Sequence, residues 1–442
     1  MKQKLLKIYF NLIWRCAKKY ISKTNPLVVW ITWSVGKTSA RMIIYQVLKK
    51  QLSNKSIYTS SKNFNWELGL PFSIFKIDSY NPWIWWLVTS FFSVFLKTLF
   101  SKPDYDIVLL EYWIDHIWEM DFMLNIVKPD FSIVTKIDKV HCLNLWSPDI
   151  TAEEKYKLAY AAKKAVFLNK DDSYSSGFQL SLDDELLVDK FYYNTTWNKS
   201  SDIDFSYYKI ISDDWIFANF NLKIKHSNLN LKTNLIWKEN AGYIWIWLAI
   251  WDIISQSKTF SDNMELNFDL QEWRFSFFDW IKDNIIIDSS YNSAPESTKK
   301  VIENVINIKE SLYPKYKLVF VLWDMRELWE FSETEHRKIA WFISSCADII
   351  YLLWDSMWSY AYDELLKIWY PKDKVYHFLD NKKLWSSLKK YLEDSDDKHI
   401  ILFKWSQNTI FLEESVKYVL KDKSDFSKLP RQSNHWLKTK EN

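Results

Sequence analysis

The sequence has very little glycine: four residues among 442. Soluble proteins carry roughly 7% glycine, so another residue must occupy most of the turns and close backbone contacts that glycine normally serves. Tryptophan is the residue in excess, with 27 copies, and the two types together make up about the usual glycine share. This composition suggests that tryptophan stands at positions where the functional protein has glycine.

The clearest such position is Trp33, within the segment 32–38, which reads Thr-Trp-Ser-Val-Gly-Lys-Thr. A loop that cradles a phosphate needs a residue without Cβ at this point, because backbone N–H groups must approach the phosphate. An indole would fill that space. We interpret most tryptophans as glycines whose UGA codons were translated as tryptophan. The alternative is a genuinely tryptophan-rich protein, and the codons at these positions distinguish the two.

Cysteine is scarce as well, and the charge is nearly balanced. The three cysteines, Cys16, Cys142 and Cys346, lie far apart with no C-x-x-C spacing, which argues against a disulfide framework or a zinc site and is typical of a reducing cytoplasm. With 58 basic and 55 acidic residues, bulk electrostatics predicts no nucleic-acid partner. No small-residue cleavage site follows the basic, apolar start, so we predict a cytoplasmic protein without a secretory signal.

Two stretches raise the question of a membrane. The segment 1–26 predicts an amphipathic basic helix that ends near Lys23; it either packs on the domain, which we favour, or lies on a membrane surface. The segment 82–100 is the most apolar of the chain and approaches transmembrane length. Because Lys97 lies near its end and several of its apolar residues are tryptophans, we expect a buried or interfacial helix. Peripheral contact with a membrane stays open.

Short apolar runs alternate with helical segments in the first half of the chain. The length of 442 residues predicts two or three domains. Four runs read as buried strands, and together they predict a parallel α/β sheet with ligands at its carboxyl edge: residues 27–32, 106–111, 131–135 and 165–169. A helix is expected over 39–50. Residues 190–235 alternate in polarity and predict an antiparallel β patch, and 240–255 predicts a helix.

A second α/β unit begins near residue 265. Its expected strands alternate with helices, which predicts a Rossmann-like domain: residues 284–288, 317–322, 348–353 and 399–404. The chain therefore divides, by sequence, into an N-terminal helix, a central P-loop domain, a Rossmann-like C-terminal domain and a charged, loosely ordered tail: 1–26, 27–264, 265–425 and 426–442.

The segment 33–38 has the chemistry of a phosphate-binding loop when Trp33 is taken as glycine. Lys37 would neutralise charge on the β and γ phosphates, and Thr38 would offer its hydroxyl to Mg²⁺. The preceding strand and following helix supply the required context, against the alternative of a chance Gly-Lys-Thr turn. Glu111, at the end of a neighbouring strand, is a candidate oxygen ligand for the same Mg²⁺, although a carboxylate at a strand end is often merely solvated.

The loop is one residue shorter than the common P-loop, and residues 31–39 resemble the signature of the Mur ligase family, the ATP-dependent amide-forming enzymes of peptidoglycan synthesis. Further segments resemble motifs of the family, and of its MurF branch in particular, at matching intervals: residues 63–71, 111–120, 288–295, 321–330 with His336, and 404–406. Eight motif tryptophans occupy family glycine positions: Trp33, Trp66, Trp113, Trp118, Trp237, Trp323, Trp329 and Trp405. The resemblance spans residues 27–420.

The resemblance implies roles for individual residues. Nucleotide contacts fall on Trp33, Ser34, Val35, Gly36, Lys37, Thr38, Ser39, Asn240, Arg274 and Asp288. Metal ligands fall on Thr38, Glu111, His141 and Lys155; catalytic roles fall on Lys37, His141 and Lys155; substrate contacts fall on Asn292, Asp324, Lys404 and Ser406. His141 precedes Lys155 by fourteen residues, and the family lysine is often carbamylated. Two departures weaken individual contacts: Glu239 replaces a family histidine, and Ser289 replaces an aspartate.

The implied activity is that of an ATP- and Mg²⁺-dependent carboxylate–amine ligase that adds D-alanyl-D-alanine to UDP-N-acetylmuramoyl-tripeptide through an acyl phosphate, acting as a monomer. MurF proteins carry an N-terminal domain that grips the UDP-sugar, whereas about 26 residues precede the central domain here. We therefore expect the uridine end to be held differently, or the carboxylate substrate to differ. The alternatives are a Mur-type ligase for a lipid-linked or truncated muropeptide, and a non-catalytic nucleotide-binding partner of cell-wall enzymes.

Overall fold

The computed structural model resolves two compact units, which are residues 1–209 with 215–268, and residues 210–214 with 269–442. The described residues are 2–32, 37–60, 68–77, 84–112, 114, 116–135, 148–172, 188–194, 204–213, 215–224, 227–255, 263–268, 276–279, 283–289, 293, 295–326, 328–404, 417, 426 and 429.

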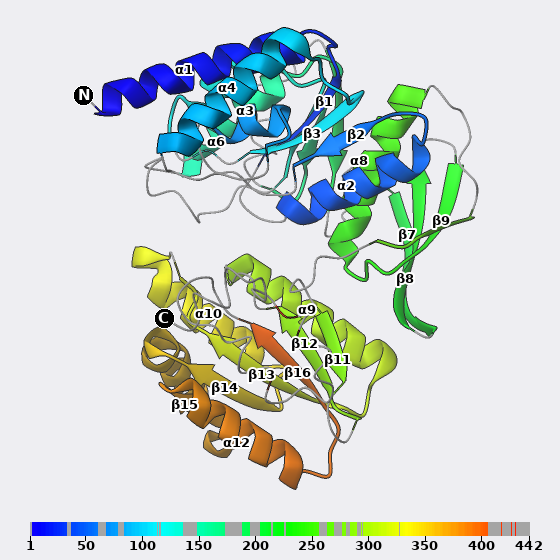
Figure 1. The fold of residues 1–442 in the computed structure, drawn as a ribbon. Helices are drawn as coiled ribbons and strands as arrows, with labels where there is room; N and C mark the ends of the chain where they lie inside the picture. Colours follow the sequence, from blue (N-terminus) through cyan, green and yellow to red (C-terminus); the bar gives the residue numbers. More distant parts are fainter. Residues whose placement is uncertain are drawn as a thin grey trace. The chain divides into compact units, whose positions relative to one another are not determined.

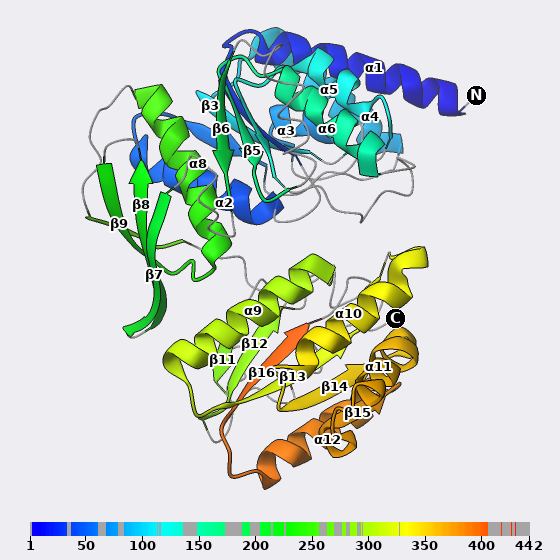
Figure 2. The same ribbon diagram turned by 180° about the vertical axis from the view of Figure 1, so that it is seen from behind.

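A six-stranded, fully parallel sheet organises the first unit (Figures 1 and 2). Its strands, in spatial order, are β2 (Ile57–Thr59), β3 (Ile107–Tyr112), β1 (Leu27–Thr32), β4 (Phe131–Val134), β5 (Ala165–Asn169) and β6 (Asp189–Tyr193). The parallel α/β prediction is confirmed. The prediction of an antiparallel patch from residue 190 is wrong for β6, because an edge strand is only half covered and alternates in polarity like a solvated strand.

Seven helices are described in this unit: α1 (Lys2–Ile21), α2 (Lys37–Gln51), α3 (Gly69–Ile74), α4 (Ile84–Phe100), α5 (Glu119–Ile126), α6 (Pro148–Tyr160) and α8 (Lys238–Ser255). Helix α1 buries Ile13, Ala17 and Tyr20 in a core that it shares with α3, α4, α5 and the sheet. The N-terminal helix therefore packs on the domain. No helix in the described part of the chain is long and apolar enough to cross a membrane.

A four-stranded sheet follows the parallel sheet in the chain. Its order is β10 (Asn263–Leu266), β9 (Ser227–Thr233), β8 (Trp215–Ile224) and β7 (Asp204–Asp213). Strands β8 and β9 are antiparallel, as the alternating pattern predicts, and β10 joins parallel to β9. Helix α8 packs beside α2.

The second unit is a six-stranded α/β sheet. Its order is β11 (Ser276–Asp279), β12 (Ile285–Ser289), β16 (His399–Lys404), β13 (Lys317–Trp323), β14 (Ile349–Leu353) and β15 (Val375–Phe378). Only β11 is antiparallel to its neighbour. The helices are α9 (Pro295–Leu312), α10 (Ser332–Ser344), α11 (Asp363–Lys367) and α12 (Asn381–Asp394), with short helical turns at Trp329–Phe331, Met357–Tyr362 and Lys372–Lys374.

The sequence prediction missed parts of the second unit. Strands β11 and β15 have four residues each and lie at the sheet edges, so they lack a long apolar run. Leu429 is buried in the core of this unit, although it lies in the segment that the charge pattern predicts to be loose. One apolar side chain among charged neighbours is too weak a signal to predict such an anchor.

Three of the six described non-glycine residues with positive φ are tryptophans: Trp118 (125°), Trp354 (83°) and Trp369 (62°). Trp369 terminates α11 in the position that glycine usually takes, because its N–H bonds to the Leu366 carbonyl (3.2 Å) and the Tyr370 N–H bonds to the Leu365 carbonyl (2.9 Å). Glycine adopts such φ values without the steric cost that an L side chain incurs. The hypothesis that tryptophan replaces glycine stays a prediction, and these positions offer a physical test.

We expect Trp369→Gly to raise the free energy of unfolding by about 0.5–1 kcal/mol, because relief of left-handed strain exceeds the entropy that glycine adds to the unfolded chain. Trp341→Gly is the matched control: both side chains are exposed (92% and 64%), but Trp341 lies within α10, where glycine costs about 0.5–1 kcal/mol. Urea unfolding measures both changes. Equal losses in the two variants would contradict the prediction.

Candidate functional site

The carboxyl end of β1 lies at the point of the first sheet where ligands are expected. Strand β1 has β3 on one side and β4 on the other, and the chain builds the sheet outward from it in both directions; open parallel sheets bind ligands at such switch points. The chain leaves β1 at Thr32 and begins α2 at Lys37. A helix N-terminus at a strand end favours a bound anion. The strand–loop–helix context is therefore as predicted.

The residues of the loop itself are only partly described. Trp33, Ser34, Val35 and Gly36 lie outside the described residues, and the side chains of Lys37, Thr38 and Ser39 do as well. Four further predicted site residues also lie outside them: His141, Arg274, Asn292 and Ser406. Their roles stay predictions.

Glu111 is buried at the carboxyl end of β3, directly beside β1 in register with Ile31. Its Oε2 lies 2.9 Å from Nε of Arg41, and the two side chains are 4% and 1% exposed. Arg41 also donates from one terminal nitrogen to the carbonyl (2.7 Å) and hydroxyl (3.1 Å) of Ser60, just beyond β2. One guanidinium thus ties α2 to the ends of β2 and β3.

The sequence prediction missed Arg41. Burial lowers the pKa of its guanidinium from the ordinary value and the Glu111 carboxylate opposes that shift, but an arginine side chain stays protonated in proteins. A signal was present: Arg41 falls on the face of α2 that buries Ala40, Ile44 and Val47, and a cation among core residues needs a buried partner.

Lys155 is buried in α6, with 2% exposure, rather than lying on the helix surface as its pattern alone would indicate. Its neighbour Glu154, equally buried, accepts hydrogen bonds from the N–H groups of Trp118 (3.0 Å) and Met120 (3.2 Å) at the start of α5. Lys157 pairs with the second oxygen of Glu154 at 2.6 Å. These contacts anchor the helix that carries Lys155.

Asn240 is buried in the first turn of α8. That turn approaches the end of β6 so closely that a Cβ at Gly242 would lie 2.6 Å from the carbonyl oxygen of Asn194. Only glycine permits this approach. The backbone therefore fixes where Asn240, the predicted nucleotide contact, lies relative to the sheet.

The second unit brings Asp288 and Lys404 to adjacent strand ends. Asp288 is fully buried near the end of β12, and Lys404, 4% exposed, ends the neighbouring strand β16. The Lys404 ammonium donates to the Ser289 carbonyl at 3.2 Å. Both predicted residues thus lie at the carboxyl edge of this sheet.

Asp324, just after β13, has both carboxylate oxygens engaged with backbone. Oδ2 accepts from the N–H of Ser356 (3.1 Å) and Oδ1 from that of Met357 (2.8 Å). A carboxylate at the start of a helical segment satisfies unpaired N–H groups. The structure thus gives Asp324 a capping role, and its predicted substrate contact stays a prediction.

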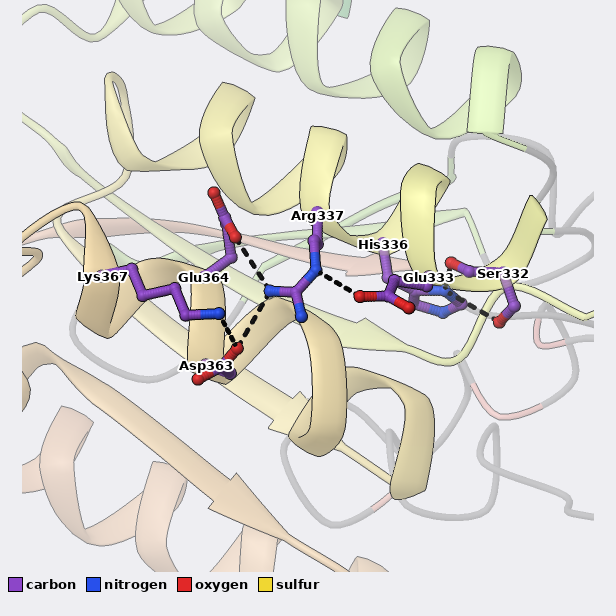
Figure 3. Close-up of polar contacts among 7 residues, drawn as sticks. All are labelled: Ser332, Glu333, His336, Arg337, Asp363, Glu364 and Lys367. Carbon is purple, nitrogen blue, oxygen red and sulfur yellow. Dashed lines mark hydrogen bonds and ion pairs between the residues drawn. The ribbon is translucent and has the colours of Figure 1, made fainter. Parts of the chain in front are cut away.

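His336 binds the backbone of Met325, the residue that follows Asp324 in the loop after β13. Its Nδ1 lies 2.7 Å from the Ser332 carbonyl (Figure 3), and its Nε2 accepts from the Met325 N–H at 3.0 Å. The neutral ring with a proton on Nδ1 fits both contacts. Burial lowers the pKa of His336 below its ordinary value, and the Ser332 carbonyl partly opposes this.

Beside His336, Arg337 joins α10 to α11 (Figure 3). Its guanidinium pairs at 2.9 Å with each of three carboxylates: Glu333, Asp363 and Glu364. These pairs are half-exposed, so we assign them a modest effect on stability. They hold α10 and α11 together, and α11 directly follows the helical turn that Asp324 caps.

Among the residues that the structure describes, no group of three histidine, cysteine or acidic side chains is placed to hold a metal. Mg²⁺ in nucleotide sites is commonly bound by one or two protein oxygens together with phosphates and water. A single buried carboxylate beside the loop, Glu111, is compatible with that kind of site.

Comparisons with known proteins agree with this layout. No family model matches the chain. It is 23% identical over 403 residues to the UDP-N-acetylmuramoyl-tripeptide--D-alanyl-D-alanine ligase of Bacillus subtilis (strain 168), covering 91% of the chain and 77% of that protein. The fold resembles MurF from Acinetobacter baumannii, with TM-score 0.71 at 15% identity over 93% of this chain and 80% of that one. It also resembles the MurF ligase from Thermotoga maritima in complex with ADP, with TM-score 0.67 at 18% identity over 90% and 80%.

We expect Glu111→Leu to lower the free energy of unfolding by about 3–5 kcal/mol, because Arg41 is left charged and buried without its partner. The double variant with Arg41→Met should lose less than the sum of the two single losses. Urea unfolding of the four proteins gives the coupling energy. Glu393→Leu, which breaks an exposed pair with Lys389, should change stability by about 0.5 kcal/mol or less. Additive losses at Arg41 and Glu111 would refute a coupled pair.

We expect His336 to make stability fall in mild acid. Because its folded-state pKa is lowered, the unfolded chain takes up a proton that the folded ring does not. The stabilisation that neutral His336 contributes to the folded protein is fully present above the ordinary histidine pKa of about 6.5. It is lost as pH falls from there towards the lower pKa of His336 in the folded protein. His336→Gln, which cannot titrate, should flatten the urea midpoint against pH in that window. Parallel curves for the two proteins would contradict this.

Proposed function

We propose that the chain is a member of the Mur ligase family, whose relative in Bacillus subtilis it resembles over 91% of its length, and that it is an ATP-dependent carboxylate–amine ligase of peptidoglycan precursor synthesis. The observation that carries the proposal is the carboxyl edge of the first sheet, where β1 leads through the Gly-Lys-Thr segment into α2 beside a buried glutamate. We further propose that it adds D-alanyl-D-alanine to UDP-N-acetylmuramoyl-tripeptide, as the names of its relatives indicate for them, and that it acts as a monomer in the cytoplasm.

The chain's own groups suit phosphoryl transfer from ATP to a carboxylate. Lys37, at the start of α2, would hold the terminal phosphates, and the helix N-terminus would add its N–H groups. Thr38 and Glu111 would hold Mg²⁺, which when bound neutralises phosphate charge. Arg41 would position Glu111, since it fixes that carboxylate at 2.9 Å.

The acyl phosphate formed in this way would react with an incoming amine. We propose that Lys155, which is buried in α6, orients the acyl phosphate. In the second unit, Asp288 and Lys404 lie on adjacent strand ends, where they would contact nucleotide and substrate respectively. Arg274 is proposed to bind ATP phosphates, and Asn292 and Ser406 to bind substrate.

We expect ADP release to require both UDP-N-acetylmuramoyl-tripeptide and D-alanyl-D-alanine, and Lys37→Ala to lower the rate by about a hundredfold or more, as loss of one charge-stabilising group does elsewhere. Lys49→Ala, an exposed lysine on the same helix, is the matched control and should keep its rate. The assay uses the protein as translated and a form with glycine at the UGA-encoded positions.

The outcomes separate the alternatives. Turnover with a carboxylate substrate that lacks UDP would indicate a Mur-type ligase of different specificity. Tight ATP binding without amine-dependent turnover, in the form with glycine at Trp33 as well, would indicate a nucleotide-binding partner instead. Full activity of Lys37→Ala would exclude the phosphate-loop mechanism.

A further inference from the structure

Helix α4 has its more apolar face outward. The side chains that it buries fully are small or polar, namely Ser90, Val94 and Thr98, and the aromatic side chains of Trp86 and Phe91 are half-buried against the same core. Its exposed face carries large apolar side chains spaced three or four residues apart, as one stripe of a helix requires: Val88, Phe92, Phe95, Leu96 and Leu99, which are 42–58% exposed, and Phe100, which is 81% exposed. A helix at the surface of a soluble domain normally has the reverse arrangement.

Helix α1, which packs beside α4, also exposes apolar side chains. The two helices lie side by side (Figures 1 and 2), joined by a hydrogen bond between the hydroxyls of Tyr9 and Ser90 at 2.9 Å. The Lys23 ammonium donates to the Ser101 carbonyl at 2.7 Å, beyond the end of α4. On α1, Ile8 and Leu12 are 56% and 40% exposed. We call these eight residues of the two helices the outer apolar face. Trp85 of α4 is also exposed, by 76%, and is left out of this set because it is a candidate glycine position.

Positive charge accompanies the outer apolar face. Helices α1 and α4 together contain seven basic residues and no acidic one, whereas the whole chain has a net charge of only +3. Arg15, Lys18 and Lys19 are exposed on α1, and Arg15 and Lys19 lie on the same side as Ile8 and Leu12 by helical spacing. The remainder of the protein is therefore net negative, and the basic charge is concentrated where the apolar side chains are exposed.

A contiguous exposed apolar surface marks an interaction site, and the charge selects its occupant. A second copy of the chain would bring two basic faces together, which costs energy. A bilayer that contains anionic lipid offers both an apolar interior and negative headgroups, and amphipathic helices bind it by lying in the plane of the interface. Because neither helix can span a membrane, we propose that α1 and α4 dock this protein on the surface of an anionic lipid bilayer.

The test is co-sedimentation of the full chain with vesicles of phosphatidylcholine alone or of phosphatidylcholine and phosphatidylglycerol in equal amounts. We expect binding to the anionic vesicles that weakens with added salt and is much weaker on the neutral ones. Phe92→Gln, Phe95→Gln and Leu99→Gln combined should lower affinity about tenfold or more. Arg15→Gln, Lys18→Gln and Lys19→Gln combined should remove the preference for anionic lipid.

The matched control removes two apolar side chains of similar exposure from the second unit, Phe331→Gln and Leu379→Gln (41% and 64% exposed), and should bind vesicles as the unchanged protein does. Urea unfolding verifies that every variant is folded. No sedimentation of the unchanged protein, or undiminished binding by the apolar triple variant, would overturn the proposal. A third result would also contradict the membrane proposal: the apolar triple variant still binds vesicles but elutes as a monomer in gel filtration, whereas the unchanged protein elutes as a dimer. The outer apolar face would then be the interface between two copies of the chain.

Discussion

The buried pair of Arg41 and Glu111 fixes the edge of the first sheet where the candidate site lies. Both side chains are almost fully enclosed and 2.9 Å apart, and Arg41 also reaches the end of β2 through Ser60. Buried ion pairs seldom add much net stability over apolar residues. What this pair contributes is position: it sets the start of α2 relative to the ends of β2 and β3, and α2 begins at the proposed phosphate-binding lysine.

The opposite, amino-terminal edges of both sheets are held by a different and repeated contact. In each case a side chain just before one strand accepts a hydrogen bond, of 2.7–2.9 Å, from the backbone N–H of a residue within one position of the start of the adjacent strand. The acceptors are Asp106, Asp130, Asn284 and Asp348, and the donors are Ser56, Val28, His399 and Leu318 respectively. A polar side chain just before a strand, at the amino-terminal edge of the sheet, therefore has a structural role. A carboxylate at the end of a strand, at the carboxyl edge, is a candidate site residue.

The sequence predicts the central strands well because they are buried on both faces and read as continuous apolar runs. Glu111 and Asp288 follow from the same logic, since each comes at the end of such a run. The edge strands β6, β11 and β15 escape prediction because their pattern is short or mixed. Arg41 and the burial of Lys155 escape it for another reason: their partners are far away in sequence, and helical spacing does not reveal them.

In the loop after β13, two residues of the sequence motif bind the protein's own backbone and so determine the conformation of the loop. Asp324 and His336 both direct their polar atoms at backbone, to Ser356 and Met357 in one case and to Met325 in the other. These bonds use only the backbone N–H groups of the residues that donate them, so they persist if neighbouring tryptophans are glycines. Trp354 has a φ of 83° and lies in the turn that Asp324 caps, so a glycine there would remove strain and leave the cap intact.

Arg326, the next residue along this loop, depends on that choice. Its guanidinium lies 5.3 Å from the centre of the Trp354 ring, within the range of a cation–π contact. With glycine at 354 that contact is lost. The identity of one turn residue therefore bears on the position of an arginine at the carboxyl edge of the second sheet.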